Sequence, residues 1–242
     1  MTRILASALL VLLASPAFAA DVFVRIKTHS DPTAAGGQAQ PARDDVTEQW
    51  YGPGKTAQSG GDGGFIVDLE KNMAYMVNHR DKSYVPMPLP IDITKVLPPE
   101  LAQMAPRMQM TASVTPTTET KTIGSWPCTA YDVSLTVMGM PMALRVWAST
   151  AVPAALLDYA SQVTPVFLQG QMRLTDESVK EFAKIRGFQV ATELTADMMG
   201  ARMRTTTEVV EIVEKPAPAG TFAPPAGYAQ KATLSLQDLQ RR

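Results

Sequence analysis

Methionine is the residue of this chain whose type and spacing come nearest to a chemical site. Of its 14 methionines, nine fall in three short clusters. The clusters are Met104, Met108 and Met110; Met138, Met140 and Met142; and Met198, Met199 and Met203. Thioether sulfur is a soft ligand that Cu(I) prefers. Met138, Met140 and Met142 therefore form a candidate Cu(I) site in a metal-handling protein.

A second interpretation of the same clusters needs no metal. Methionine side chains are flexible and polarisable, so they fill irregular apolar space or line surfaces that adapt to ligands of different shape. The clusters contain no histidine, and Met108 and Met110 alternate with polar residues as one face of a strand does. We therefore favour packing or ligand binding over a metal site.

The other residues with chemical potential form no catalytic or metal-binding pattern. His29 and His79 are the only histidines, and neither has a second imidazole or a cysteine at the spacing that zinc requires. Cys128 is the only cysteine, so it has no partner for an intramolecular disulfide. Because it begins an alternating run, we expect a small buried hydrophobic residue rather than a reactive thiol.

Motifs and charge also argue against several functions. The stretch Gly52–Thr56, "GPGKT", lacks the glycine that a phosphate loop needs five residues before Gly54, where Gln49 stands, so a turn is predicted. No G-x-S-x-G motif is present. Lys and Arg number 22 against 23 Asp and Glu, well interspersed, which provides no basic surface for nucleic acid. We expect a protein that is not an enzyme and uses no cofactor.

The first residues are typical of an export signal. Arg3 precedes an apolar run at residues 4–14, and Ala17-Phe18-Ala19 matches a small-x-small cleavage site. The run is too short to span a bilayer. Residues 1–19 are therefore predicted to be a signal peptide, leaving a periplasmic protein with no integral membrane segment after cleavage.

Alternating apolar and polar residues predict many strands. Such runs lie at Val22–Lys27, in several short strands over residues 46–88, at 108–114 and at 188–194 and 203–213. The clearest is a hairpin within 122–150, where Tyr131, Val133 and Leu135 share one face. Two amphipathic helices are predicted at 153–168 and near 175–185, with Pro165 ending or kinking the first and Gly187 closing the second. Short helices are expected within 90–106, and residues 32–41 read as a mobile loop.

The order of these pieces resembles a known group of proteins. The stretches "WYGPGK", "FIVDLEKNMAYMVNHRDKSYVPMP", "ETKTIGSWPCTAYDVSL", "RVWAST", "GFQV" and "FAPPAGY" are similar to an exported bacterial family of unassigned function, related to the LolA/LolB-like outer-membrane lipoprotein carriers. The resemblance covers about residues 46–228. It implies a mainly β fold with a few helices, in which a curved antiparallel sheet forms an incomplete (half) β-barrel covered by helices. The expected organisation is one LolA-like domain over residues 20–230 and a flexible C-terminal tail over 231–242.

A half-barrel of this type implies a hollow that holds an acyl chain, a lipid or a lipidated partner. The residues expected to line it are Tyr75, Tyr84, Met108, Met110, Val133, Leu135, Leu144 and Val146. Two alternatives stay open at this point. One is the methionine-based Cu(I) protein, and the other is a structural or interaction module whose barrel is filled by its own side chains.

Overall fold

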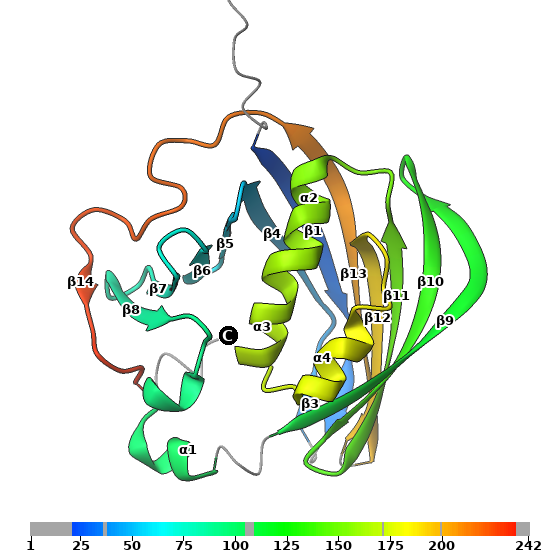
Figure 1. The fold of residues 1–242 in the computed structure, drawn as a ribbon. Coiled ribbons are helices and arrows are strands. Elements are labelled where there is room, and N and C mark those ends of the chain that lie inside the picture. Colours follow the sequence, from blue (N-terminus) through cyan, green and yellow to red (C-terminus); the bar gives the residue numbers. More distant parts are fainter. Residues whose placement is uncertain (1–20, 36–37, 105–108, 171, 199, 236–242) are drawn as a thin grey trace, which may run out of the picture.

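The structure of the protein is a computed structural model that describes residues 21–35, 38–104, 109–170, 172–198 and 200–235. The predicted signal peptide and Met108 lie outside these residues. The described chain is mainly β, and Figure 1 shows its strands in one large sheet with helices packed on one side. The sheet has 12 strands in the order β14-β8-β7-β6-β5-β4-β1-β13-β12-β11-β10-β9, so it is not closed.

The strands pair antiparallel, apart from the short parallel pair of β14 with β8. Their bounds are β1 (Val22–Ser30), β4 (Arg43–Gly52), β5 (Lys55–Gly60), β6 (Gly63–Asp68), β7 (Met73–Asn78), β8 (Ser83–Pro88), β9 (Met110–Ile123), β10 (Trp126–Val137), β11 (Met140–Ser149), β12 (Phe188–Met198), β13 (Ala201–Glu214) and β14 (Ala229–Gln230). The helices are η1 (Ile93–Lys95), α1 (Pro99–Met104), α2 (Ala154–Asp158), the π-helix η3 (Tyr159–Val163), α3 (Thr164–Gly170) and α4 (Asp176–Phe182).

Tight turns with positive φ explain why strands that follow one another in the sequence also pair in the sheet. At the turn from β10 to β11, Met138 and Gly139 have φ values of 51° and 80°. Two successive positive values match the twist of the flanking strands, as in a type I′ turn. The hairpin predicted within residues 122–150 is confirmed, with Val133 opposite Leu144.

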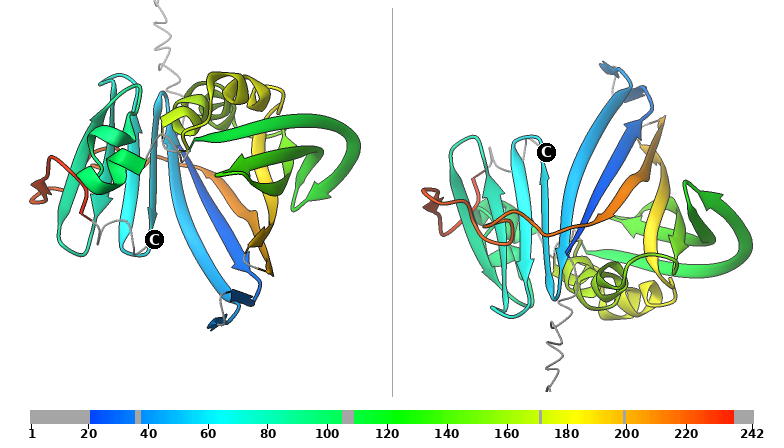
Figure 2. Two further views of the ribbon diagram at one scale, coloured as in Figure 1. Left: turned by 90° about the horizontal axis from the view of Figure 1, so that it is seen from below. Right: turned by 90° about the horizontal axis from the view of Figure 1, so that it is seen from above.

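The inner face of the sheet, defined here as the face under the helices, holds most of the core. Its central cluster includes Val22, Val24 and Tyr51 from β1 and β4, packed against Leu156 of α2. One flank of the inner face, on β6 to β8, packs against η1 and α3, and the other, on β9 to β12, packs against α4. Figure 2 shows these two flanks on either side of the helices.

The helix predicted at 153–168 continues through Pro165 instead of ending there. The backbone widens into the π-helix η3 just before the proline, and the N–H of Thr164 bonds the carbonyl of Tyr159. Proline has no N–H to donate, so an irregular turn accommodates it with little loss of backbone bonding. The second predicted helix is α4, whose N-cap is Thr175, with its side chain accepting from the Ser178 N–H at 3.2 Å.

Two local predictions were wrong. Residues 33–40 contain a small hairpin, β2 (Thr33–Ala35) with β3 (Gln38–Gln40), in place of an irregular loop. Gly187 does not close α4, which is capped by Ala183. Its φ of 98° serves another purpose, because a Cβ at this position would lie 2.3 Å from the carbonyl oxygen of Ser149.

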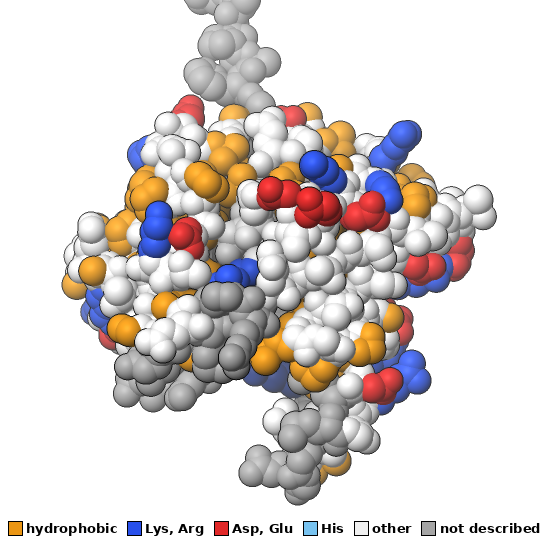
Figure 3. Space-filling view, turned by 60° about the horizontal axis from the view of Figure 1, so that its bottom comes forward, with side chains coloured by type: hydrophobic (Ala, Val, Ile, Leu, Met, Phe, Trp, Pro, Cys, Tyr) orange, Lys and Arg blue, Asp and Glu red, His pale blue; other side chains and the backbone are white. Residues whose placement is uncertain are grey.

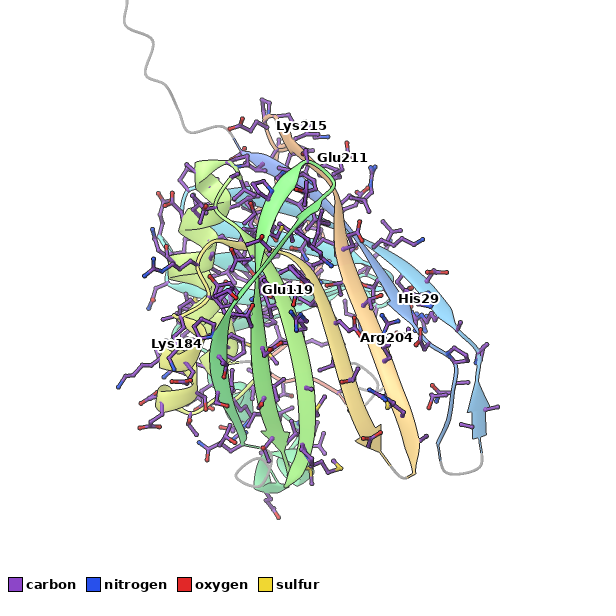
Figure 4. The ribbon with its side chains drawn as sticks, turned by 90° about the vertical axis from the view of Figure 1, so that its right-hand side faces the viewer. His29, Glu119, Lys184, Arg204, Glu211 and Lys215 are labelled. Atoms are coloured by element: carbon purple, nitrogen blue, oxygen red, sulfur yellow. The ribbon has the colours of Figure 1, made fainter. Side chains whose placement is uncertain are left out.

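The outer face between β4 and β9 carries charged side chains that pair across strands. Arg25 bonds Glu211 at 2.5 Å, and Arg204 bonds Glu193 at 2.8 Å. Figure 4 labels Arg204, Glu211 and His29 on the neighbouring strands β13 and β1. These pairs are partly exposed, so each contributes little free energy of folding, but their charged groups keep this face hydrated.

Both edge strands are protected. On β9, the N–H groups of Ala112 and Val114 donate to Ser178 Oγ at 2.8 Å and to Glu181 Oε2 at 2.9 Å, both on α4. On β8, the last described segment adds β14 and then turns to the inner face. An uncovered sheet edge invites pairing with other chains, so these contacts help to keep the molecule separate from its copies.

Candidate functional site

Most residues expected to line a hollow come together, but they form packed core. Val133, Leu135 and Val146 share the inner face of β10 and β11 with the partly buried Met110 and Leu144. Leu168 of α3, Leu174 and Phe182 of α4 pack with them, so Val133 is 2% exposed and Val146 is fully buried. This flank of the sheet is filled by side chains of the protein itself.

The two tyrosines of the same expected set lie away from this packed core, and Tyr84 is among the residues that line the groove described next. Tyr75 and Tyr84 are on the outer face of β7 and β8, with their ring centroids 6.1 Å apart. The segment after β13 covers them through Phe222 and Tyr228. Tyr84 also donates to Gln230 Oε1 at 3.2 Å, so these rings fix the C-terminal segment to the sheet. Met108 lies outside the described residues.

An open groove of about 640 Å³ occupies the inner face of the other flank, at one end of β5 to β8. Its floor includes a cross-strand row in which Gln58 faces Phe65, Phe65 faces Met76 and Met76 faces Val85. The side chains of Phe167 on α3 and Leu234 also line it. A volume of this size lies within the range of about 300–1,000 Å³ found for small-molecule sites.

Glycine keeps the next row of this groove open. Gly60 pairs with Gly63, so two neighbouring positions carry no side chain. A Cβ at Gly60 would lie 2.6 Å from Thr47 Cγ2, which is closer than packed atoms approach. A larger residue at position 60 would therefore press on β4 and narrow the groove.

The rim of the groove is charged but balanced. Arg43 pairs with Asp45 at 2.6 Å, Arg80 pairs with Asp62, and Lys231 pairs with Asp81. The first four of these residues and Asp81 line the groove. Because each positive side chain has a carboxylate partner, the rim favours a polar head group without a strong preference for one sign of charge.

Leu234 enters the groove from the far side of the sheet. After β14, the Lys231 N–H donates to the Tyr84 carbonyl at 2.8 Å, and the Leu234 N–H donates to the Val96 carbonyl at 2.7 Å. The Leu234 side chain is 4% exposed and packs with Phe65 and Val85 among others. One wall of the groove therefore comes from the segment expected to be a flexible tail.

A buried tyrosine pair lies in the core beside the groove. The rings of Tyr51 and Tyr159 meet edge to face at 4.6 Å, and the Tyr51 hydroxyl donates to Gln49 Oε1. Burial raises the pKa of Tyr51 well above its ordinary value and also raises that of Tyr159. Both hydroxyls therefore stay neutral at physiological pH and do not act as bases.

Metal-binding and nucleophilic side chains are sparse in the part of the chain that the structure describes. No group of three or more His, Cys, Asp and Glu residues there is placed to hold a metal ion. Cys128 is buried, its thiol donates to the Trp126 carbonyl at 3.3 Å, and burial raises its pKa. No described helix has the length and apolar character needed to cross a membrane.

No family model matches this chain, and no curated protein does. Among solved structures, a structure of PNGF-II aligns with 86% of this chain and 31% of its own, at 10% identity and a TM-score of 0.38. The chain thus spans about a third of the length of that protein. A likeness of this degree carries no argument about function.

Sequence reasoning missed the groove residues Gln58, Met76, Val85, Phe167 and Leu234. The run "MAYMV" at 73–77 is apolar at every position, so alternation did not show which face of β7 points inward. One available signal was the glycine cluster at 60–64, which removes side chains from adjacent strands.

Proposed function

We propose that this protein is a periplasmic binding protein that holds the apolar chain of an amphiphile in the groove on β5 to β8. The observation that supports it best is a groove of about 640 Å³ that combines apolar side chains with a charge-balanced rim. The expected ligand is an acyl chain, a lipid or a lipidated partner. The described open sheet with helices on one face is compatible with the incomplete barrel of the LolA/LolB-like carriers, and we place the protein with them as part of this proposal.

Burial of hydrocarbon would drive binding in such a site. Each buried methylene contributes about 0.8 kcal/mol, which is about fourfold in Kd. Phe65, Met76 and Val85 line the groove and bring no buried charge that must be neutralised. The protein's own packing leaves them 9%, 7% and 2% exposed, so a ligand would contact only the parts of these side chains that still face the groove. A binding role therefore needs no catalytic group and no cofactor.

The site proposed here shares only Tyr84 with the one expected from the sequence. Val133, Leu135, Leu144 and Val146 support the fold beneath α4, whereas the ligand would contact Phe65, Met76, Val85 and Phe167. The filled-barrel alternative describes the β9 to β12 flank well. It describes the β5 to β8 flank poorly, because the groove there is open.

Native mass spectrometry of the mature protein, purified from the periplasm of its own cells, tests the proposal. A bound amphiphile that is released on extraction is the expected result. A bare protein that also fails to bind palmitate or a lysophospholipid in titration calorimetry would refute it.

A pair of neighbouring substitutions tests the position of the site. Gln58 is exposed on the inner face and lines the groove, whereas the adjacent Ser59 is exposed on the outer face. Gln58→Trp should fill the groove and weaken binding at least tenfold, and Ser59→Trp should leave it unchanged. Tryptophan suits exposed strand positions, so both variants should fold. Equal affinities of the two variants would place the ligand elsewhere.

A further inference from the structure

Three methionine side chains are exposed at the same end of the sheet as the groove, but on other strands. Met138 is 55% exposed, and Met140 and Met203 are each 37% exposed. They lie at or next to two hairpin turns, between β10 and β11 and between β12 and β13. Figure 3 brings the lower end of the molecule forward and shows hydrophobic side chains grouped there.

Strand register places some of these thioethers on a common face. Met142 faces Ala196 on β12, and Ala196 faces Met203 on β13. Directly paired residues point to the same side of a sheet, and so do residues two apart on one strand. Met142 packs on the inner face, so Met140 and Met203 belong to that face as well.

The spacing lets the three sulfur atoms approach one another. Met140 and Met142 are two residues apart along β11, about 6.6 Å at about 3.3 Å per residue. Met142 and Met203 are two strands apart, about 9.6 Å at about 4.8 Å per strand. The residue between them is Ala196, whose small side chain leaves room for the longer thioethers to meet above it.

Strand preference does not explain methionine at these positions. The other large hydrophobic side chains exposed on the described surface are Val46 and Val210, which are β-branched as strands favour. Methionine loses more rotamer freedom on ordering than leucine does, and at the exposed positions 140 and 203 there is little packing to offset that loss. Its distinguishing property is soft sulfur.

We propose that Met140, Met142 and Met203 form a binding site for a soft monovalent metal ion, Cu(I) being the natural candidate. Thioether ligands select Cu(I) over the harder divalent ions. The register replaces Met138 of the sequence-based triad by Met203, because Met138 occupies the turn with a φ of 51°. The site lies on β11 and β13, so this inference does not rest on the proposed amphiphile groove.

The direct test measures metal binding to the full mature chain. Native mass spectrometry and competition titration use Ag(I) as a redox-stable probe and Cu(I) under reducing conditions. One bound ion per chain is expected, and Zn(II) should not displace it. The triple variant M140L/M142L/M203L should weaken binding at least tenfold, and leucine keeps the side-chain volume close enough to preserve the fold.

Two further variants serve as controls. Cys128→Ala removes the only thiol of the chain, and Met76→Leu removes a thioether of the groove; both variants should bind the ion as the unmodified chain does. Absence of binding by the unmodified chain, full binding by the triple variant, or loss of binding in either control would overturn the proposal.

Oxidation provides a readout at single residues. Peroxide should oxidise Met138, Met140 and Met203 in the metal-free protein, because all three are exposed. Ag(I) should slow oxidation of Met140 and Met203 and leave Met138 unaffected, as measured by peptide mass spectrometry. Equal protection of Met138 would contradict the assignment of the site to one face.

Discussion

Replacement of Leu234 by alanine should tighten ligand binding while it destabilises the fold. The side chain is 4% exposed and forms one wall of the groove. Leu→Ala removes three carbon atoms, and at about 0.8 kcal/mol per buried group the transfer term is about 2.4 kcal/mol. The free energy of unfolding should fall by about this amount or less, because the vacated space joins the groove and leaves no closed cavity.

The same space becomes available to a ligand. If methylenes of a long acyl chain replace the lost carbon atoms, the gain reaches at most about 2.4 kcal/mol, or about 50-fold in Kd. A short chain that does not reach Leu234 should gain much less. The expected result is therefore a selective increase in affinity for palmitate over octanoate.

Titration calorimetry of both fatty acids with the unmodified protein and L234A measures this difference. Leu144→Ala is the matched control, because Leu144 packs against the cluster under α4. It should lower stability and leave both affinities unchanged. Unchanged or weaker palmitate binding in a folded L234A protein would refute the idea that Leu234 and the ligand share one surface.

Three stability predictions concern other parts of the fold. Ser178→Ala leaves the Ala112 N–H without its acceptor and should cost about 1–3 kcal/mol in urea unfolding, whereas exposed Ser134→Ala should change stability by less than about 0.5 kcal/mol. Burial raises the pKa of Asp68, but hydrogen bonds and charge from Lys71 outweigh it, and the net pKa is lowered from 3.8. The contribution of Asp68 to stability is thus present above pH 3.8 and is lost as the pH falls through the folded-state pKa. In a plot of unfolding midpoint against pH, Asp68→Asn should make the decline at acid pH less steep. Tyr51 has a raised pKa, so its contribution to the free energy of unfolding is present below pH 10.0 and is lost as the pH rises through the folded-state pKa. Tyr51→Phe should remove this loss of stability at alkaline pH.

The local pattern of apolar and polar residues predicted which segments form strands and helices better than it predicted which side chains face each other in the folded chain. The period-two alternation around Val133 and Leu144 was enough to pair β10 with β11, because one face of that hairpin is polar. The sequence leaves Thr175 and Asp176 as equal candidates for the cap of α4, and the structure shows that it is Thr175. In β7, by contrast, both faces are buried, and the sequence-based prediction named Tyr75, which lies on the outer face, rather than Met76 on the inner face.

The position of the open groove depends on contacts between distant segments. Leu234 lies in the polar stretch "KATLSLQD", and nothing local shows that it crosses the edge of the sheet to reach Val96. Similarly, the sequence shows α4 to be amphipathic but not which strands it covers. Those strands turned out to be the ones expected to line the hollow, which is why that flank is filled.

The size of the sheet explains why parts of its inner face stay uncovered. Twelve strands at about 4.8 Å span about 53 Å along the curve of the sheet. A helix with its side chains is about 10–12 Å wide, and Figure 1 shows α2 and α3 running along the strands rather than across them. Such a run covers two or three strands, and α4 covers a similar width beside it.

Uncovered inner-face surface is therefore expected on the β5 to β8 flank and at strand ends beyond α4. The residue types at the two places differ in a way that packing does not require. The first offers phenylalanine, valine and glycine beside paired charges, which suits a hydrocarbon chain with a polar head. The second offers Met140, Met142 and Met203, with sulfur at each position. Because filling a gap demands neither arrangement, we expect the two surfaces to bind chemically different ligands independently of each other.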